Sequence, residues 1–165
     1  MPLHELDGRV AVVTGAGSGI GRAMVAHFGG LGMRVAAADI DGAAAEAAVA
    51  AASGGAGGGD DAFAMAVDVA DGDAVAALAD AVEERWGTTH LLCNNAGVFQ
   101  AGLAWERTPA DWEWALGVNL WGIIHGIRAF VPRMLAAGEE GHVVNTSSVA
   151  GFVAAPFSGP YNVSK

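Results

Sequence analysis

The segment Thr14-Gly-Ala-Gly-Ser-Gly-Ile-Gly21 is the strongest indication of the fold of this chain. It follows the apolar run Val10–Val13, which is typical of a strand buried on both faces. It precedes Ile20–Leu31, which we predict to be a helix closed by Gly32. Glycines permit a tight turn and let the backbone approach a pyrophosphate, whose charge a helix N-terminus stabilises. A strand, a glycine turn and a helix in this order predict a dinucleotide-binding α/β fold, although a lone glycine motif also occurs as a merely flexible turn.

Short apolar runs alternate with longer helical segments along the chain, which is the pattern of an α/β domain with a parallel sheet. The further strands are predicted at 34–38, 62–67, 90–93 and 142–145, and the further helices at 43–52, 71–86 and 111–137. Asp71 is a candidate N-cap, and the last of these helices is expected to bend or break near Pro132. Pro160 suits the first turn of a final helix. Gly54–Gly59 follows a helix rather than a strand, so we interpret it as a surface connection.

The composition narrows the class of protein and its partners. The chain has 165 residues, enough for one domain with a core, and 53% of them are apolar. A net charge of −10 argues against nucleic acid and anionic membranes as partners, because both are polyanions. No apolar run approaches the length that spans a bilayer, and the N-terminal residues lack a signal pattern. The single cysteine, Cys93, cannot form an internal disulfide, so we expect a cytoplasmic protein in which Cys93 is a small buried hydrophobe.

Asp39 ends the second predicted strand, 18 residues beyond Gly21. A carboxylate there can accept hydrogen bonds from the adenosine ribose hydroxyls and would repel a 2′-phosphate. Neither Ser18 nor Ile40 is a basic residue that could offset this repulsion. The sequence therefore favours NAD over NADP, with an ordinary turn carboxylate as the alternative reading of Asp39.

Tyr161 and Lys165 are four residues apart, which places them on the same face of a helix. There the ammonium can lie near the phenol and favour the phenolate, which makes the tyrosine a candidate for proton transfer near neutral pH. This spacing alone has little weight, because it occurs by chance in many helices.

Four further motifs lie between the glycine turn and this pair. Asp68-Val69 follows the third predicted strand, Asn94-Asn-Ala-Gly97 the fourth, and Asn145-Thr-Ser-Ser148 ends the fifth, while Val118-Asn-Leu120 lies in the long helix. In this order the motifs resemble those of the classical short-chain dehydrogenase/reductase family. The resemblance covers residues 8–165, and the glycine spacing is that of the classical rather than the extended members.

The resemblance implies a Rossmann-type, doubly wound parallel sheet of strand order 3-2-1-4-5 and a nicotinamide cofactor, NAD in preference to NADP. It implies no metal. The implied cofactor contacts are Gly15, Ser18, Gly19, Ile20, Gly21, Asp39, Asp68, Val69, Asn94, Ala96, Gly97, Tyr161 and Lys165.

The resemblance also implies four catalytic residues. Tyr161 is the implied general acid/base on a secondary alcohol or ketone, and Lys165 favours the phenolate and binds the nicotinamide ribose. Ser148 precedes Tyr161 by 13 residues, which selects it over Ser147 as the donor to the reacting oxygen. Asn119 is implied to hold a local kink and a proton-relaying water. Taken singly, Ser148 could be a turn serine, Asn119 a helix-kink residue and Lys165 a surface charge.

The family fold continues with two more strands after the fifth, and these normally carry part of the nicotinamide pocket, the substrate loop and part of the subunit interface. Residues 1–165 are therefore expected to form an incomplete NAD(P)-binding domain with little dehydrogenase activity by itself. The leading interpretation is a hydride-transferring oxidoreductase, and the alternative is a nucleotide-binding module without turnover. The resemblance implies a homodimer or homotetramer for the complete protein. Substrate identity and reaction direction stay open.

Overall fold

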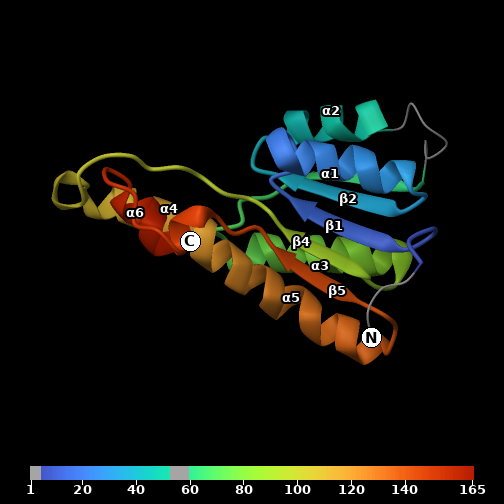
Figure 1. The fold of residues 1–165 in the computed structure, drawn as a ribbon. Helices are drawn as coiled ribbons and strands as arrows, with labels where there is room; N and C mark the ends of the chain where they lie inside the picture. The colour runs from blue at the N-terminus through green and yellow to red at the C-terminus, as the bar shows by residue number, and fades with distance from the viewer. Residues whose placement is uncertain (1–4, 53–59) are drawn as a thin grey trace.

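A parallel five-stranded sheet forms the centre of the protein, which is described by a computed structural model over residues 5–52 and 60–165. The strand order is β3-β2-β1-β4-β5, and every neighbouring pair is parallel (Figure 1). The strands are β1 (Val10–Thr14), β2 (Arg34–Asp39), β3 (Ala62–Ala66), β4 (Leu91–Asn94) and β5 (His142–Asn145). The predicted Rossmann-type sheet and its order are confirmed, whereas the connection at Gly54–Gly59 lies outside the described residues.

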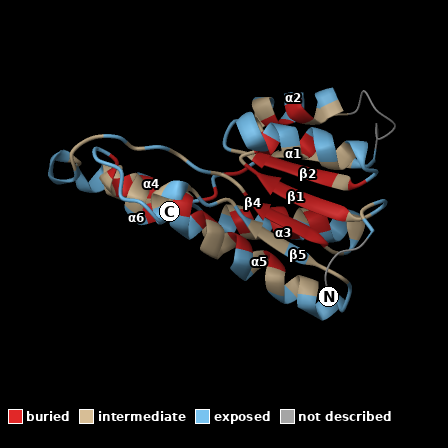
Figure 2. Cartoon of the chain, in the orientation of Figure 1, coloured by how far each residue is buried: buried red, intermediate tan, exposed pale blue. Residues whose placement is uncertain are grey.

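Helices cover both faces of this sheet. The helices α1 (Gly19–Gly30) and α2 (Gly42–Ala52) pack on one face, and α3 (Gly72–Trp86) and α5 (Gly122–Ala137) pack on the other (Figure 1). Because both faces are covered, the central strands are continuous apolar runs, and Figure 2 shows β1 buried along its length while the edge strand β5 is not.

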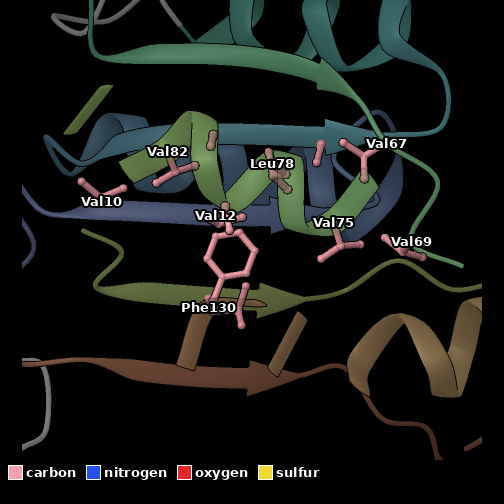
Figure 3. Packing of buried hydrophobic residues seen from close by; sticks show 12 residues of the cluster. Val10, Val12, Val67, Val69, Val75, Leu78, Val82 and Phe130 are labelled. Atoms are coloured by element: carbon pink, nitrogen blue, oxygen red, sulfur yellow. The ribbon is translucent and has the colours of Figure 1, made fainter. Parts of the chain in front are cut away.

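Successive side chains of β1 point into two different cores. Ala11 and Val13 pack with Val25 of α1, whereas Val10 and Val12 pack with α3 and α5. Figure 3 shows the second cluster, in which Phe130 extends from α5 toward the valines of β1. These two clusters fix the strands relative to one another. The loops that form the site described below follow the carboxyl ends of the strands.

The helix ends follow the predicted capping residues. Asp71 is the N-cap of α3, where its side chain accepts hydrogen bonds from the backbone N–H groups of Asp73 and Ala74. A short helix, α6 (Gly159–Ser164), has Pro160 in its first turn as predicted. Beside α6 lies α4 (Pro109–Leu116), and both occupy the region beyond the carboxyl ends of the strands (Figure 1).

The long predicted helix changes its geometry at a different place from the expected one. Helix α5 continues through Pro132, so the chain is not broken there. A π-helical turn, η2 (Gly117–Trp121), instead separates α4 from α5. Such turns insert an extra residue, and here the turn contains the fully buried Asn119. Within this turn, Asn119 bonds to Val98 and Ser164, which lie 21 and 45 residues away in the sequence.

The continuous helical run Pro109–Ala137 is long and apolar enough, by length and composition, to cross a bilayer. The expectation that no stretch approaches this length is therefore wrong. Core helices of soluble proteins pass the same test, and this run packs against α3 and β4 in the described structure, with Phe130 fully buried. One such helix is weak evidence for a membrane protein.

Candidate functional site

A cavity of about 560 Å³ opens at the carboxyl ends of the strands. Strands β1 and β4 are neighbours here, and their following helices cross to opposite faces, so the cavity lies where ligands bind in doubly wound sheets. The predicted site residues that line it are Gly15, Ser18, Gly19, Ile20, Asp39, Asp68, Val69, Ala96, Gly97, Tyr161 and Lys165. Segments spread over 150 residues of sequence thus meet in one place.

The glycine turn between β1 and α1 is shaped by close backbone contacts. Gly15 has a φ of 65°, and a Cβ atom there would lie 2.8 Å from the Cα of Ala96. A Cβ at Gly21 would overlap the carbonyl oxygen of Gly15. Gly21 is not among the residues that line the cavity. Its missing side chain instead allows α1 to pack directly against the turn. The first two residues of α1, Gly19 and Ile20, line the cavity, so the N-terminus of this helix lies at the site, as anion binding at a helix N-terminus requires.

Asp39 lies at the end of β2 and joins the glycine turn to the rim of the cavity. Its Oδ2 accepts a hydrogen bond of 2.8 Å from the backbone N–H of Gly17, and its Oδ1 accepts one of 3.0 Å from Asp41. A carboxylate has about four lone-pair sites, so the side chain can still accept from a ligand hydroxyl. Lys165 is the one Lys or Arg among the described residues that line this cavity.

The segment after β3 forms another wall. Asp68 accepts a hydrogen bond of 2.9 Å from the backbone N–H of Ala70, which closes a tight turn. Val69 is 7% exposed and packs against Gly122 of α5, where a Cβ would lie 2.8 Å from its side chain. The pair predicted from the sequence is therefore in place at the cavity.

The structure places Asn94 outside the cavity, in contrast to the prediction. Asn94 is the last residue of β4, is 3% exposed, and donates a 2.8 Å hydrogen bond to Oδ1 of Asn145 on β5. Its side chain lies under α5, where a Cβ at Gly126 would overlap it. The alternation of side chains along a strand places the next residue, Asn95, at the cavity instead.

Thr14 is a residue that sequence reasoning missed. Its Oγ1 accepts hydrogen bonds from the backbone N–H groups of Asn95 and Ala96, at 3.0 and 3.1 Å. Asn95 in turn donates through Nδ2 to the carbonyl oxygen of Thr14 at 3.0 Å. These bonds tie the turn after β1 to the turn after β4. The hydroxyl at the end of the first strand was the sequence signal for this role.

Tyr161 and Lys165 approach the cavity from α6. The Tyr161 ring packs edge-on against Phe99, with 5.0 Å between ring centroids. The Nζ of Lys165 donates a 3.2 Å hydrogen bond to the carbonyl oxygen of Thr146, just after β5. That ammonium group and the side chain of Asn119 both lie 3.3 Å from where a Cβ of Gly97 would be. Gly97 therefore keeps open the space where the predicted lysine and asparagine meet.

Asn119 connects three segments without lining the cavity itself. Its Oδ1 accepts from the N–H of Val98 at 2.8 Å, and its Nδ2 donates to the Val98 carbonyl oxygen at 2.9 Å. The same Nδ2 donates to Oγ of Ser164 at 2.8 Å, next to Lys165. The described geometry therefore shows Asn119 bracing the cavity wall and α6.

Ser148 lies at the edge of the site rather than in its lining. It is the N-cap of a short 3₁₀ turn, η3 (Val149–Gly151), and its Oγ accepts from the N–H of Ala150 at 3.2 Å. Ser147 lines the cavity instead. Because the Ser148 hydroxyl is an acceptor in the cap, its own hydrogen is still available for donation.

Comparisons with known proteins agree with this geometry. A family model described as short chain dehydrogenase matches residues 9–165. A protein of Mycobacterium tuberculosis described as "Putative oxidoreductase SadH" is 39% identical over 165 residues, covering 99% of this chain and 58% of SadH. The chain thus spans a little over half the length of this curated relative.

Solved structures match as well. A short-chain dehydrogenase/reductase from Burkholderia phymatum in complex with NAD has a TM-score of 0.94 at 45% identity, covering 98% of this chain and 57% of that one. A metagenomic short-chain oxidoreductase in complex with NADP has a TM-score of 0.91 at 38% identity, covering 97% and 71%. With the family match over residues 9–165, these likenesses show that the chain belongs to the short-chain dehydrogenase family.

Proposed function

We propose that this chain carries the cofactor cleft and the catalytic residues of an NAD-dependent oxidoreductase acting on a secondary alcohol or ketone. The observation that carries the proposal is the meeting of the glycine turn, Asp39 and the Tyr161–Lys165 pair in one cavity. The close packing at Gly15 and Gly21, where a Cβ would meet backbone atoms, supports a dinucleotide, because a glycine turn of this kind lets the backbone approach a pyrophosphate.

In the proposed reaction the nicotinamide cofactor, when bound, exchanges a hydride with the substrate carbon. As the phenolate, Tyr161 takes the alcohol proton in oxidation and becomes the phenol; as the phenol, it gives its proton to the carbonyl oxygen in reduction. Lys165 provides a positive charge on the same helix, and its bond to Thr146 holds it at the cavity. Ser148 donates to the reacting oxygen, which requires its hydroxyl to turn from the edge of the site toward the substrate.

The preference for NAD over NADP is part of this proposal and rests on Asp39. Its carboxylate lies at the cavity and is fixed by Gly17 and Asp41, so a 2′-phosphate would approach a held negative charge. Related structures are found with either cofactor, so the family alone does not decide.

Titration of the protein with NAD⁺ and NADP⁺ by isothermal calorimetry tests the cofactor preference. We expect NAD⁺ to bind at least about tenfold more tightly, since a hydrogen bond to a charged group contributes about 1.5–3 kcal/mol. Asp39→Asn keeps an oxygen that can accept from the N–H of Gly17 but removes the negative charge. It should therefore reduce the difference in affinity between NAD⁺ and NADP⁺. Asp41→Asn, at an exposed neighbouring carboxylate, is the matched control. Equal affinities in the unaltered protein would contradict the preference.

A nucleotide-binding module without turnover is the second candidate function, and the position of Ser148 outside the lining of the cavity favours it. Reduction of NAD⁺ in the presence of a panel of secondary alcohols separates the two. The dehydrogenase proposal expects turnover, low in residues 1–165 alone, that Tyr161→Phe abolishes while NAD⁺ binding persists. Binding without turnover on any alcohol or ketone would support the module.

We further propose that the protein forms a homo-oligomer through α5. Apolar side chains along this helical region are exposed, among them Trp121 at 51% and Leu135 at 76%. Light scattering coupled to gel filtration tests this, and Trp121→Glu should shift the protein toward the monomer. A monomer at all concentrations would contradict the proposal.

A further inference from the structure

His125 of α5 makes one directed contact with the wall of the cavity. Its Nδ1 lies 3.0 Å from the carbonyl oxygen of Val69. A carbonyl oxygen can only accept, so Nδ1 carries the hydrogen and donates it. Val69 follows Asp68 in the segment between β3 and α3, and both residues line the cavity, whereas His125 does not.

The surroundings of the imidazole hold it in this position. The ring lies over Gly72, where a Cβ would lie 3.3 Å from Cδ2 and 3.4 Å from Nε2 of His125. The ring of Trp121, the last residue of η2, lies beside the imidazole, with 5.9 Å between the ring centroids. Small residues at Gly117 and Gly122 let the helical segment press against Ala70 and Val69. Packing thus brings the helix close, and the imidazole adds the polar contact that fixes the orientation of the Val69 carbonyl.

The same helical segment also braces the catalytic end of the cavity. Asn119 lies six residues before His125 and bonds to Val98 and Ser164. The π-helical turn η2, which contains Asn119, changes the direction in which successive side chains point, so one segment reaches two walls. Among the described contacts of this segment, Asn119 forms hydrogen bonds to the wall near Lys165, and His125 forms one to the wall at Asp68–Val69.

We propose that His125 is a positioning residue that fixes the Asp68–Val69 wall and thereby strengthens binding of the adenosine part of the dinucleotide. This rests on the proposed function, because it takes the cavity to be a dinucleotide site. The side chain acts through the Val69 backbone and does not touch the nucleotide. The wall lies next to Asp39, the proposed partner of the adenosine ribose, because β3 pairs with β2 and the N–H of Val67 bonds to the Asp39 carbonyl oxygen at 2.8 Å. We therefore expect the effect on the adenosine half of the ligand.

Titrations with AMP, nicotinamide mononucleotide and NAD⁺ test this half-site effect. His125→Leu removes the donor and should raise the Kd for AMP and for NAD⁺ about fivefold, the change expected for one lost hydrogen bond. The Kd for nicotinamide mononucleotide should stay unchanged. His125→Asn places an amide nitrogen near the position of Nδ1 and should restore most of the AMP affinity. His142→Leu, an exposed histidine at the start of β5, is the matched control.

Hydrogen exchange provides a readout that does not depend on ligand. The backbone N–H of Ala70 bonds to Asp68 Oδ1 and that of Asp71 to the Asp68 carbonyl oxygen, so their exchange reports the order of this turn. Both should exchange faster in His125→Leu and normally in His125→Asn. If the leucine variant does not fold, His125→Met is the second donor-free variant.

Unchanged AMP affinity in a folded donor-free variant would overturn the inference, as would an equal loss for AMP and nicotinamide mononucleotide. Failure of the unaltered protein to bind NAD⁺ would instead contradict the proposed function. In that case normal exchange of Ala70 and Asp71 in the leucine variant would still overturn the positioning role, and faster exchange would support it.

Discussion

Replacing Asn119 by alanine is the sharpest test of how this fold holds its cavity. The side chain is fully buried, and it makes three hydrogen bonds: two with the backbone of Val98 and one with Ser164. Asn119→Ala removes all three at once and leaves the N–H and carbonyl of Val98 without these partners. Ser164 is affected less, because its Oγ also donates to the Tyr161 carbonyl oxygen at 2.9 Å.

The expected loss of stability follows from these contacts. A hydrogen bond contributes about 1 kcal/mol net, so three of them give about 3 kcal/mol. The better helix propensity of alanine offsets roughly 0.5 kcal/mol of this loss. For a domain of this size, such a change lowers Tm by roughly 5–10 °C.

Urea denaturation followed by circular dichroism measures the change, with Asn162→Ala as the control. Asn162 makes a single, exposed side-chain bond, to the Ala155 carbonyl oxygen at 2.8 Å, so its loss should be below about 1 kcal/mol. NAD⁺ affinity should also fall in Asn119→Ala, because Val98 lines the cavity. If Asn119→Ala loses no more stability than Asn162→Ala, the bracing role is refuted.

Three further predictions concern the glycine turn, the far end of the sheet and the core. Gly21→Ala puts a Cβ onto the Gly15 carbonyl oxygen, so a titration should show NAD⁺ binding weakened more than about tenfold. The hydrogen bond from His90 holds the pKa of Glu139 below its ordinary value of 4.5. The ionised carboxylate therefore stabilises the fold above pH 4.5, and this stabilisation is lost as the pH falls through the lower pKa of the folded state. The Tm of the unaltered protein should therefore fall more steeply on acidification below 4.5 than that of Glu139→Gln; parallel curves would contradict this. Burial raises the pKa of the Cys93 thiol to about 11, so a disulfide reagent at about pH 8 should modify it only after unfolding, and rapid reaction of the native protein would show the opposite.

Much of the fold was predictable because its signals are local. The apolar runs before Thr14 and Asp39 marked strands buried on both faces, and Asp71 and Pro160 marked helix starts through their own backbone preferences. The interruption at Gly117–Trp121 was not placed correctly: it includes Asn119, whose partners lie far away in sequence, and not the proline of the long helix. Local chemistry therefore predicted where helices and strands start, whereas it did not predict where the long helix is interrupted by the π-helical turn.

The candidate site divides in the same way. Residue spacing was enough to predict the parallel sheet, the glycine turn, the acidic residue at the end of β2 and the Tyr161–Lys165 pair, since each depends on one element or its ends. Tertiary structure alone decided that Asn95 rather than Asn94 faces the cavity and that Ser148 caps a turn at its edge. It also brought His125 to the Val69 carbonyl, 56 residues away in the chain. The physical reason is that side-chain direction and hydrogen-bond partners depend on how the strand ends and helices pack, and no spacing along the chain encodes that packing.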